Sequence, residues 1–200
     1  MEIKEGSLTF CFSENMTAIK FDDTNFYRKS FNNLPGGKGV DMIADSTDWL
    51  QLIEIKNCTG HETENVWRTS ANNSKSINGE DSFDNEVAKK VASTIACLYG
   101  AWSRQDSSES AKKLSGIWKG ACSTQIPKDK KPIMVILFLE GNFGVTGTES
   151  RSKRSIMKRL QDSIESKLSW LNCRVSVVDS TTYPHKLFEV MVIFIGQLIF

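Results

Sequence analysis

GVDMIADSTDWLQLIEIKN, residues 39–57, is the stretch that decides the fold. It holds two aliphatic runs, 39–45 and 50–57, on either side of the turn-forming residues Ser46-Thr47-Asp48. Apolar, β-prone runs bounded by turn residues predict two antiparallel strands joined as a hairpin. Because apolar residues point to both sides of these strands, both faces of the sheet are expected to be largely covered.

A four-residue loop over 46–49 fixes the register of this hairpin and places Asp41 directly opposite Glu54. The Cβ atoms of such a pair lie roughly 4.5–5.5 Å apart, and alternation along the strand puts Lys56 on the same face. Two facing carboxylates repel each other unless a cation lies between them. The hairpin therefore predicts a charged cluster built around a divalent cation.

Magnesium fits this donor set, and manganese is an alternative. Mg²⁺ binds one or two protein carboxylates and completes its shell with water and substrate phosphate, which matches Asp41, Glu54 and the Ile55 carbonyl oxygen. Lys56 would then orient or help to deprotonate the attacking water and stabilise negative charge in the transition state. The expected catalytic residues are Asp41, Glu54 and Lys56.

This pattern, Asp41 followed by Glu54-x-Lys56 across a hairpin, resembles the PD-(D/E)xK nuclease superfamily, with Val40 in place of the name-giving proline. The resemblance implies a restriction-endonuclease-like fold and a metal-dependent nuclease that acts on DNA in a prokaryotic or mobile-element setting. It also implies a further acidic residue and a further polar or basic one. The acidic candidates are Glu14, Asp22 and Asp23, and the basic ones are Lys89 and Lys90.

The segment before this hairpin predicts a second hairpin and a short helix. Leu8 to Phe12 and Ala18 to Phe21 are β-prone runs that we expect to pair with each other. Asp23 or Thr24 would cap a helix that ends before Pro35. Its expected buried stripe is Tyr27, Phe31 and Leu34.

The segment after it alternates helices and strands. A polar loop over 61–81 precedes a helix from about residue 84, whose apolar stripe includes Val87 and Val91. A Ser- and Lys-rich connection leads to the strand Ile133 to Leu139, a helix over 151–171 and a strand over 174–178. We predict one α/β domain over 1–200 with a mixed central sheet flanked by helices and an N-terminal β-hairpin. Its parts are the hairpin and helix 7–34, the catalytic hairpin 39–57, the loop 61–81 and the α/β part 84–200.

Charge divides unevenly along the chain. Residues 1–100 carry 10 Lys and Arg against 15 Asp and Glu, whereas residues 101–200 carry 15 against 9. An acidic half that collects a cation and a basic half that attracts a polyanion suit an enzyme acting on nucleic acid. The residues expected to contact phosphates are Arg151, Lys153, Arg154 and Lys158.

Other classes of protein are disfavoured. The longest apolar run, 187–200, is interrupted by Glu189 and Gln197 and is shorter than the roughly 18 residues that a membrane span needs. The N-terminus lacks a secretory pattern, so a cytoplasmic location and no membrane partner are expected. The apolar run should be buried on its own core or in a homodimer, which would suit cleavage of both strands.

The leading hypothesis is a Mg²⁺-dependent nuclease. The alternative is a non-catalytic module that keeps the α/β core and binds nucleic acid or protein through its basic half. A third interpretation is an ordinary α/β protein in which Asp41, Glu54 and Lys56 occur by chance.

Overall fold

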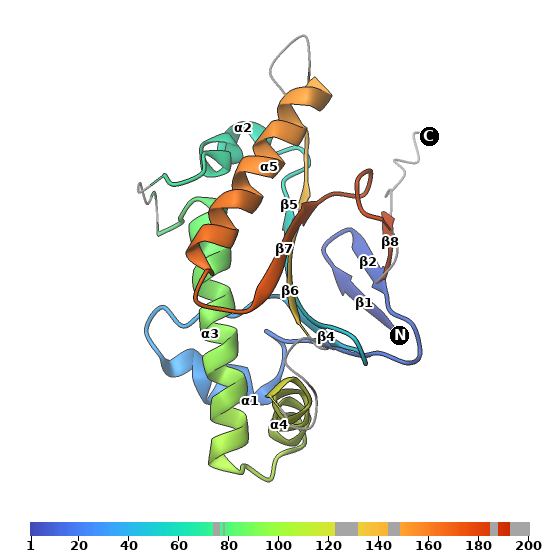
Figure 1. The fold of residues 1–200 in the computed structure, drawn as a ribbon, viewed down its shortest axis with the longest axis vertical. Helices are drawn as coiled ribbons and strands as arrows, with labels where there is room; N and C mark the ends of the chain where they lie inside the picture. The colour runs from blue at the N-terminus through green and yellow to red at the C-terminus, as the bar shows by residue number, and fades with distance from the viewer. Residues whose placement is uncertain (74–76, 78, 123–131, 144–148, 185–187, 193–200) are drawn as a thin grey trace, which may run out of the picture.

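The computed structural model describes residues 1–73, 77, 79–122, 132–143, 149–184 and 188–192. Two sheets pack face to face, and the larger one carries helices on its other face (Figure 1). The mixed α/β fold predicted from the sequence is therefore confirmed. None of the helices in these ranges is long and apolar enough to cross a membrane.

The larger sheet has five strands in the order β3-β4-β5-β6-β7. β3 pairs with β4 and β4 with β5 in antiparallel orientation, whereas β6 is parallel to β5 and β7 is parallel to β6. Asp45 pairs with Leu50 and Ile43 with Leu52, so the predicted hairpin register is confirmed. The strands are Thr17–Lys20 (β3), Met42–Asp45 (β4), Leu50–Asn57 (β5), Ile133–Glu140 (β6) and Cys173–Val178 (β7).

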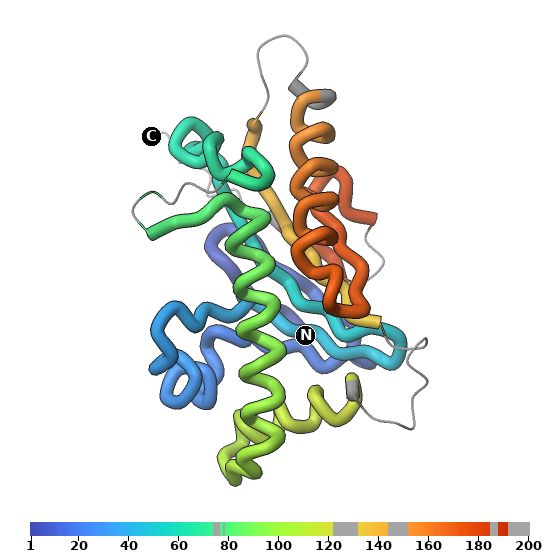
Figure 2. Tube along the Cα trace, turned by 60° about the vertical axis from the view of Figure 1, so that its left-hand side comes forward, coloured from blue at the N-terminus to red at the C-terminus, as the bar shows by residue number. Residues whose placement is uncertain are grey.

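Two long helices cover one face of this sheet. Figure 2 shows α3 (Phe83–Arg104) running along the face with α5 (Glu149–Lys167) beside it. Val87 and Val91 are fully buried, as the helical stripe predicted, because every third or fourth side chain faces the sheet. The Ser- and Lys-rich segment was wrongly read as a connection, since it forms α4 (Glu109–Cys122), which packs on α3.

The smaller sheet covers the other face and corrects the expected N-terminal pairing. A hairpin is present, but it joins β1 (Glu2–Glu5) to β2 (Leu8–Cys11), and β2 also pairs with β8 (Glu189–Val192). β3 belongs to the larger sheet instead, because its backbone pairs with β4. Phe188 is buried in the protein's own core and β8 pairs with β2, whereas Met191 is exposed and 193–200 lie outside the described residues.

The connection between β3 and β4 brings the chain tightly past an aromatic pair. It contains α1 (Asn25–Lys29), capped by Thr24, and the short helix η1 (Phe31–Asn33). Leu34 is exposed rather than buried, because the helix ends before it could complete the predicted stripe. A Cβ on Gly39 would lie 2.2 Å from the Phe21 ring, so only glycine lets the chain enter β4 along this path.

The first part of the polar loop 61–81 forms helical structure that its composition did not predict. It contains α2 (Glu62–Asn65) and the 3₁₀ helix η2 (Val66–Thr69). Arg68, on η2, is 5% exposed, and its guanidinium lies 4.6 Å from the centre of the Phe83 ring. The loop is therefore held against the start of α3.

Candidate functional site

The predicted charged cluster forms where β5 ends beneath α3. Continuation of the observed register places Asp41, just before β4, opposite Glu54 on β5. The Asp41 carboxylate accepts a hydrogen bond of 2.6 Å from the Ile55 backbone N–H through Oδ2. Glu54 is fully buried, and Lys56, two residues along the strand, lies with its Nζ 3.0 Å from Glu54 Oε1. The structure thus brings Asp41, Glu54 and Lys56 together as expected.

α3 adds a second lysine to the same carboxylates. Lys90 Nζ lies 2.6 Å from Glu54 Oε1 and 3.4 Å from Asp41 Oδ1. Lys89 instead forms an exposed ion pair with Asp81. Of the two helix lysines that the sequence left open, Lys90 is therefore the one in the cluster.

Glu86 and Arg68 belong to this site and were not predicted. Glu86 Oε1 accepts a hydrogen bond of 2.8 Å from Lys56 Nζ, and its Oε2 pairs with Arg68. Arg68 also lies 3.1 Å from Glu80 Oε1. Glu86 and Lys90 are four residues apart on α3 and face one another, so helical spacing carried a signal for Glu86. Arg68 lies in a segment without periodicity, so the sequence carried no signal that it belongs to the site.

Burial sets the electrostatics of the cluster. Burial raises the pKa of Glu54 to about 7, and the charge of Asp41 acts in the same direction. The charges of Lys56 and Lys90 act in the opposite direction and lower it. Burial would lower the pKa of Lys90, but Glu54 and Asp41 hold it above its usual range. The pKa of Glu86 is lowered, because Lys56 and Lys90 outweigh the effect of burial. A carboxyl group whose pKa lies near 7 although two lysines are next to it is strongly perturbed, and such perturbed groups are common at functional sites.

Asp22 is the acidic candidate nearest to the cluster. Burial raises its pKa, and the charge of Asp41 raises it further. Its Oδ1 is buried and has no hydrogen-bond partner among the described residues. Asp23 is bound by Arg28 and Lys20, and Glu14 is exposed. The structure therefore favours Asp22 over the other two.

A cavity of about 220 Å³ opens beside the cluster. Lys56 and Lys90 line it and also contact Glu54, so a molecule in the cavity meets the ammonium groups first. Cationic lining residues outnumber the acidic ones, which favours an anionic occupant such as a phosphate. The charged lining residues are Lys38, Lys56, Arg68, Lys89 and Lys90 with Glu80, Asp81 and Glu86.

The donor set fits a magnesium ion with few protein ligands. Glu54 Oε2 is buried and lacks a hydrogen-bond partner in the described part of the chain, and Asp41 lies opposite it. Two carboxylates are what Mg²⁺ commonly takes from a protein, whereas zinc requires three or four ligands. No group of three or more His, Cys, Asp or Glu that could hold a metal occurs among the described residues.

The basic residues predicted to contact phosphates are spread along α5 rather than around this cavity. Lys153 lies 2.5 Å from the buried Asp179 and Lys158 lies 2.7 Å from Asp162, so both have acidic partners within the protein. Arg154 is exposed, and the side chain of Arg151 lies outside the described residues. Arg154 is thus the one of the three described residues that no acidic partner holds.

Comparison with known proteins gives a family but no activity. A model described as a family of unknown function, DUF6661, matches residues 24–192, which include the whole cluster from Asp41 to Lys90. No curated protein and no solved structure matches the chain.

Proposed function

We propose that this chain, which belongs to the DUF6661 family of unknown function, is a metal-dependent phosphodiester hydrolase acting on nucleic acid, with DNA as its substrate. One observation carries the proposal. Two facing carboxylates, Asp41 and Glu54, meet the ammonium groups of Lys56 and Lys90 beside a cavity rich in cations. Carboxylates for a divalent metal and lysines for a phosphate are the parts that such a hydrolysis requires.

Asp41 and Glu54 would hold Mg²⁺ or Mn²⁺, and the Ile55 carbonyl oxygen is the third proposed ligand. A bound divalent ion lowers the pKa of its water and neutralises charge on the phosphate. The protein's own contribution begins with Lys56, whose ammonium reaches from Glu54 towards the cavity and can donate to a phosphate oxygen. Glu86 accepts from Lys56, and Arg68 binds Glu86, so these two residues position the Lys56 ammonium.

Lys90 compensates the two carboxylates when they carry no other cation. Its Nζ bridges Asp41 and Glu54, which would otherwise repel each other in a buried setting. Because Lys90 also lines the cavity, its ammonium can turn towards a bound phosphate. We therefore assign Lys90 a substrate-binding role, in which its ammonium leaves the two carboxylates and donates to the phosphate.

The same ion pairs favour a second candidate function. Glu54 is neutralised by two lysines within 3.0 Å, which is the arrangement of a stable buried network as well as of a resting active site. A non-catalytic module that binds nucleic acid or protein would keep this network permanently. A prokaryotic setting remains part of the proposal and follows from the resemblance. The cytoplasmic location and the homodimer are expectations from the sequence patterns described above, and these contacts do not test them.

Cleavage assays with a chelator separate the two functions. Purified protein is incubated with plasmid, linear duplex and single-stranded DNA in Mg²⁺, in Mn²⁺ and in EDTA, and we expect cleavage that EDTA abolishes. Calorimetric titration with Mn²⁺ should show weaker binding for Asp41→Ala and Glu54→Ala. Asp48→Ala, an exposed carboxylate in the same hairpin, is the matched control and should bind as wild type. Cleavage that survives EDTA, or variants with unchanged metal affinity and activity, would refute the proposal.

A further inference from the structure

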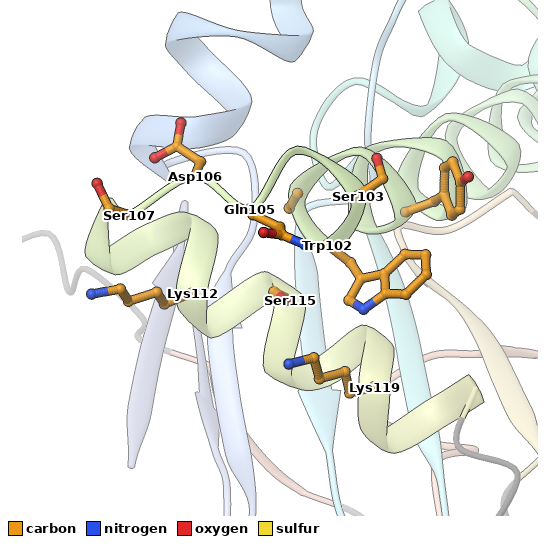
Figure 3. A pocket seen from close by; sticks show the side chains of 10 residues that line it. Trp102, Ser103, Gln105, Asp106, Ser107, Lys112, Ser115 and Lys119 are labelled. Carbon is orange, nitrogen blue, oxygen red and sulfur yellow. The ribbon is translucent and has the colours of Figure 1, made fainter.

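A second and larger pocket lies between the C-terminal turns of α3 and the helix α4. Its volume is about 580 Å³, and it lies away from the charged cluster, which faces the N-terminal half of α3. Figure 3 shows Trp102 projecting from α3 towards α4, with Lys112, Ser115 and Lys119 on the α4 side. An indole and two ammonium groups thus share one hollow.

The aromatic side chains of this pocket are unusually open to solvent. Tyr99 is 49% exposed and Trp102 is 39% exposed, although both rings could pack in a core. The Tyr99 ring centre lies 5.6 Å from that of Trp102 and 5.6 Å from that of Trp118. Tyr99 packs against both tryptophans while Tyr99 and Trp102 stay exposed, and exposed aromatic side chains are the groups on which unpaired bases stack.

The charge of the pocket suits a phosphate next to such a base. Lys112 and Lys119 are seven residues apart on α4, which is about two turns, so they lie on the same side of that helix. Neither lysine forms a salt bridge with another described residue. Asp106 also lines the pocket, but its carboxylate accepts a hydrogen bond of 2.8 Å from the Ser108 backbone N–H.

The exposed face of α3 between this pocket and the mouth of the charged cluster is called the track here. Lys89 lines the cavity beside the cluster and Tyr99 lines the aromatic pocket, and both lie on the exposed face of α3. The exposed residues between them, Ala92 and Ala96, are small and present little relief. Ten residues of α-helix span about 15 Å. Stacked nucleotides advance about 3.4 Å each, so four to five of them cover this distance.

We propose that the Tyr99–Trp102 pocket binds an unpaired base and its phosphate in a single-stranded segment of the nucleic acid that reaches the Asp41–Glu54 cluster. The inference rests on the proposed function and extends it by naming the form of the substrate. A single strand is required, because a base inside a duplex is already stacked and offers no free face to Tyr99 or Trp102.

Binding is tested in EDTA, so that no cleavage intervenes, by fluorescence anisotropy of labelled dT10 and dT3. We expect Tyr99→Ala and Trp102→Ala each to weaken dT10 binding roughly 5-fold or more, as loss of one stacked base does. Trp170→Ala removes a tryptophan that is 60% exposed after the end of α5 and should bind as wild type. The double variant Lys112→Gln, Lys119→Gln changes only surface side chains, and it should lower the salt slope of dT10 binding by about 1.4.

The length of the oligonucleotide tests the track. Wild-type protein should bind dT10 more tightly than dT3, and a tenfold excess of dTMP should not displace dT10. Equal affinity of dT10 for wild-type and Trp102→Ala protein, or absence of binding to dT10 altogether, overturns the inference. Displacement by dTMP overturns the track and leaves a mononucleotide pocket.

The outcome is separable from that of the proposed function. Duplex cleavage that requires Mg²⁺ and Lys56, in a protein whose Trp102→Ala variant binds dT10 normally, retains the nuclease and removes the pocket. Tight dT10 binding that depends on Trp102, without any cleavage, retains the pocket and removes the nuclease.

Discussion

Two buried acid–lysine clusters lie along the first two turns of α3, and they differ in which groups donate hydrogen bonds to their carboxylates. At the first, Glu54 meets the ammonium groups of Lys56 and Lys90, and burial raises its pKa to about 7. At the second, Asp84 Oδ2 accepts from Ser163 Oγ at 2.6 Å, the Asn72 N–H at 2.8 Å and Lys167 Nζ at 2.9 Å. Both carboxylates are fully buried, so burial alone does not separate them.

The difference is in the donors. Although burial would raise it, hydrogen bonds from Ser163 and Ser82 and from the Asn72 backbone hold the pKa of Asp84 at about 2. Among the described residues, Glu54 has only Lys56 and Lys90 as partners. These lysines also line a cavity and can turn away from the carboxylate. A carboxylate fixed by backbone and hydroxyl donors joins α3, α5 and the 61–81 loop, whereas one held by movable lysines beside a cavity is available for chemistry.

The largest expected difference, in cleavage rate and in stability, is between two variants that each replace one lysine, Lys56 in the first cluster and Lys167 in the second. Lys56→Ala should lower the rate of DNA cleavage at least about 100-fold, because it removes a donor aimed at the phosphate, while Mn²⁺ affinity stays near that of wild type. Lys167→Gln should cleave at nearly the wild-type rate but unfold at a lower urea concentration. Cleavage rates, calorimetry and urea unfolding of both variants measure this. Equal loss of activity in the two variants would erase the functional distinction between the clusters.

Acid should reveal the anchoring role of Asp84. A carboxylate whose folded pKa of about 2 lies below its unfolded value of 3.8 stabilises the fold above about pH 4, and this contribution is lost as the pH falls towards 2. Asp84→Asn should therefore lower the free energy of unfolding by about 2 kcal/mol at pH 7 and by progressively less at lower pH.

Urea unfolding of wild type and Asp84→Asn between pH 7 and pH 3 measures this convergence. Asp162→Asn is the control, since Asp162 is exposed and, among the described residues, pairs only with Lys158 on the same helix. Its change should stay within about 0.5 kcal/mol at every pH. A constant difference between wild type and Asp84→Asn over this range would show that Asp84 acts through packing and not through its charge.

Sequence predicted the first cluster better than the second because of how each is built. A four-residue turn and strand alternation determine the positions of Asp41, Glu54 and Lys56 within 16 residues of chain. Lys90 could also have been chosen over Lys89, since it follows the buried Val87 by three positions and so lies beside the stripe that faces the sheet.

The second cluster joins residues 79 and more positions apart, Asp84 with Ser163 and Lys167, and local patterns carry no information about that contact. The same holds for the pairing of β2 with β8, which joins the two ends of the chain and displaced the hairpin expected with Ala18 to Phe21. Arg68 was missed because a polar loop has no period from which burial can be read. The sequence thus predicts the register of a local hairpin and the buried face of a helix, but it does not predict pairing between distant segments.

The smallest expected effect concerns two neighbouring basic residues of α5, which repeat the contrast between anchored and available groups on the surface. Lys153 forms a salt bridge with Asp179, whereas Arg154 is exposed. Burial would raise the pKa of Asp179, but hydrogen bonds from Lys153 and Thr182 lower it to about 2. If nucleic acid contacts α5, Arg154→Ala should reduce the salt slope of duplex DNA binding by about 0.9, the value for one phosphate contact. Lys153→Ala should leave that slope unchanged and lower the urea midpoint instead. Binding isotherms at several salt concentrations distinguish the two, and an unchanged slope for Arg154→Ala would exclude Arg154 from the nucleic-acid interface.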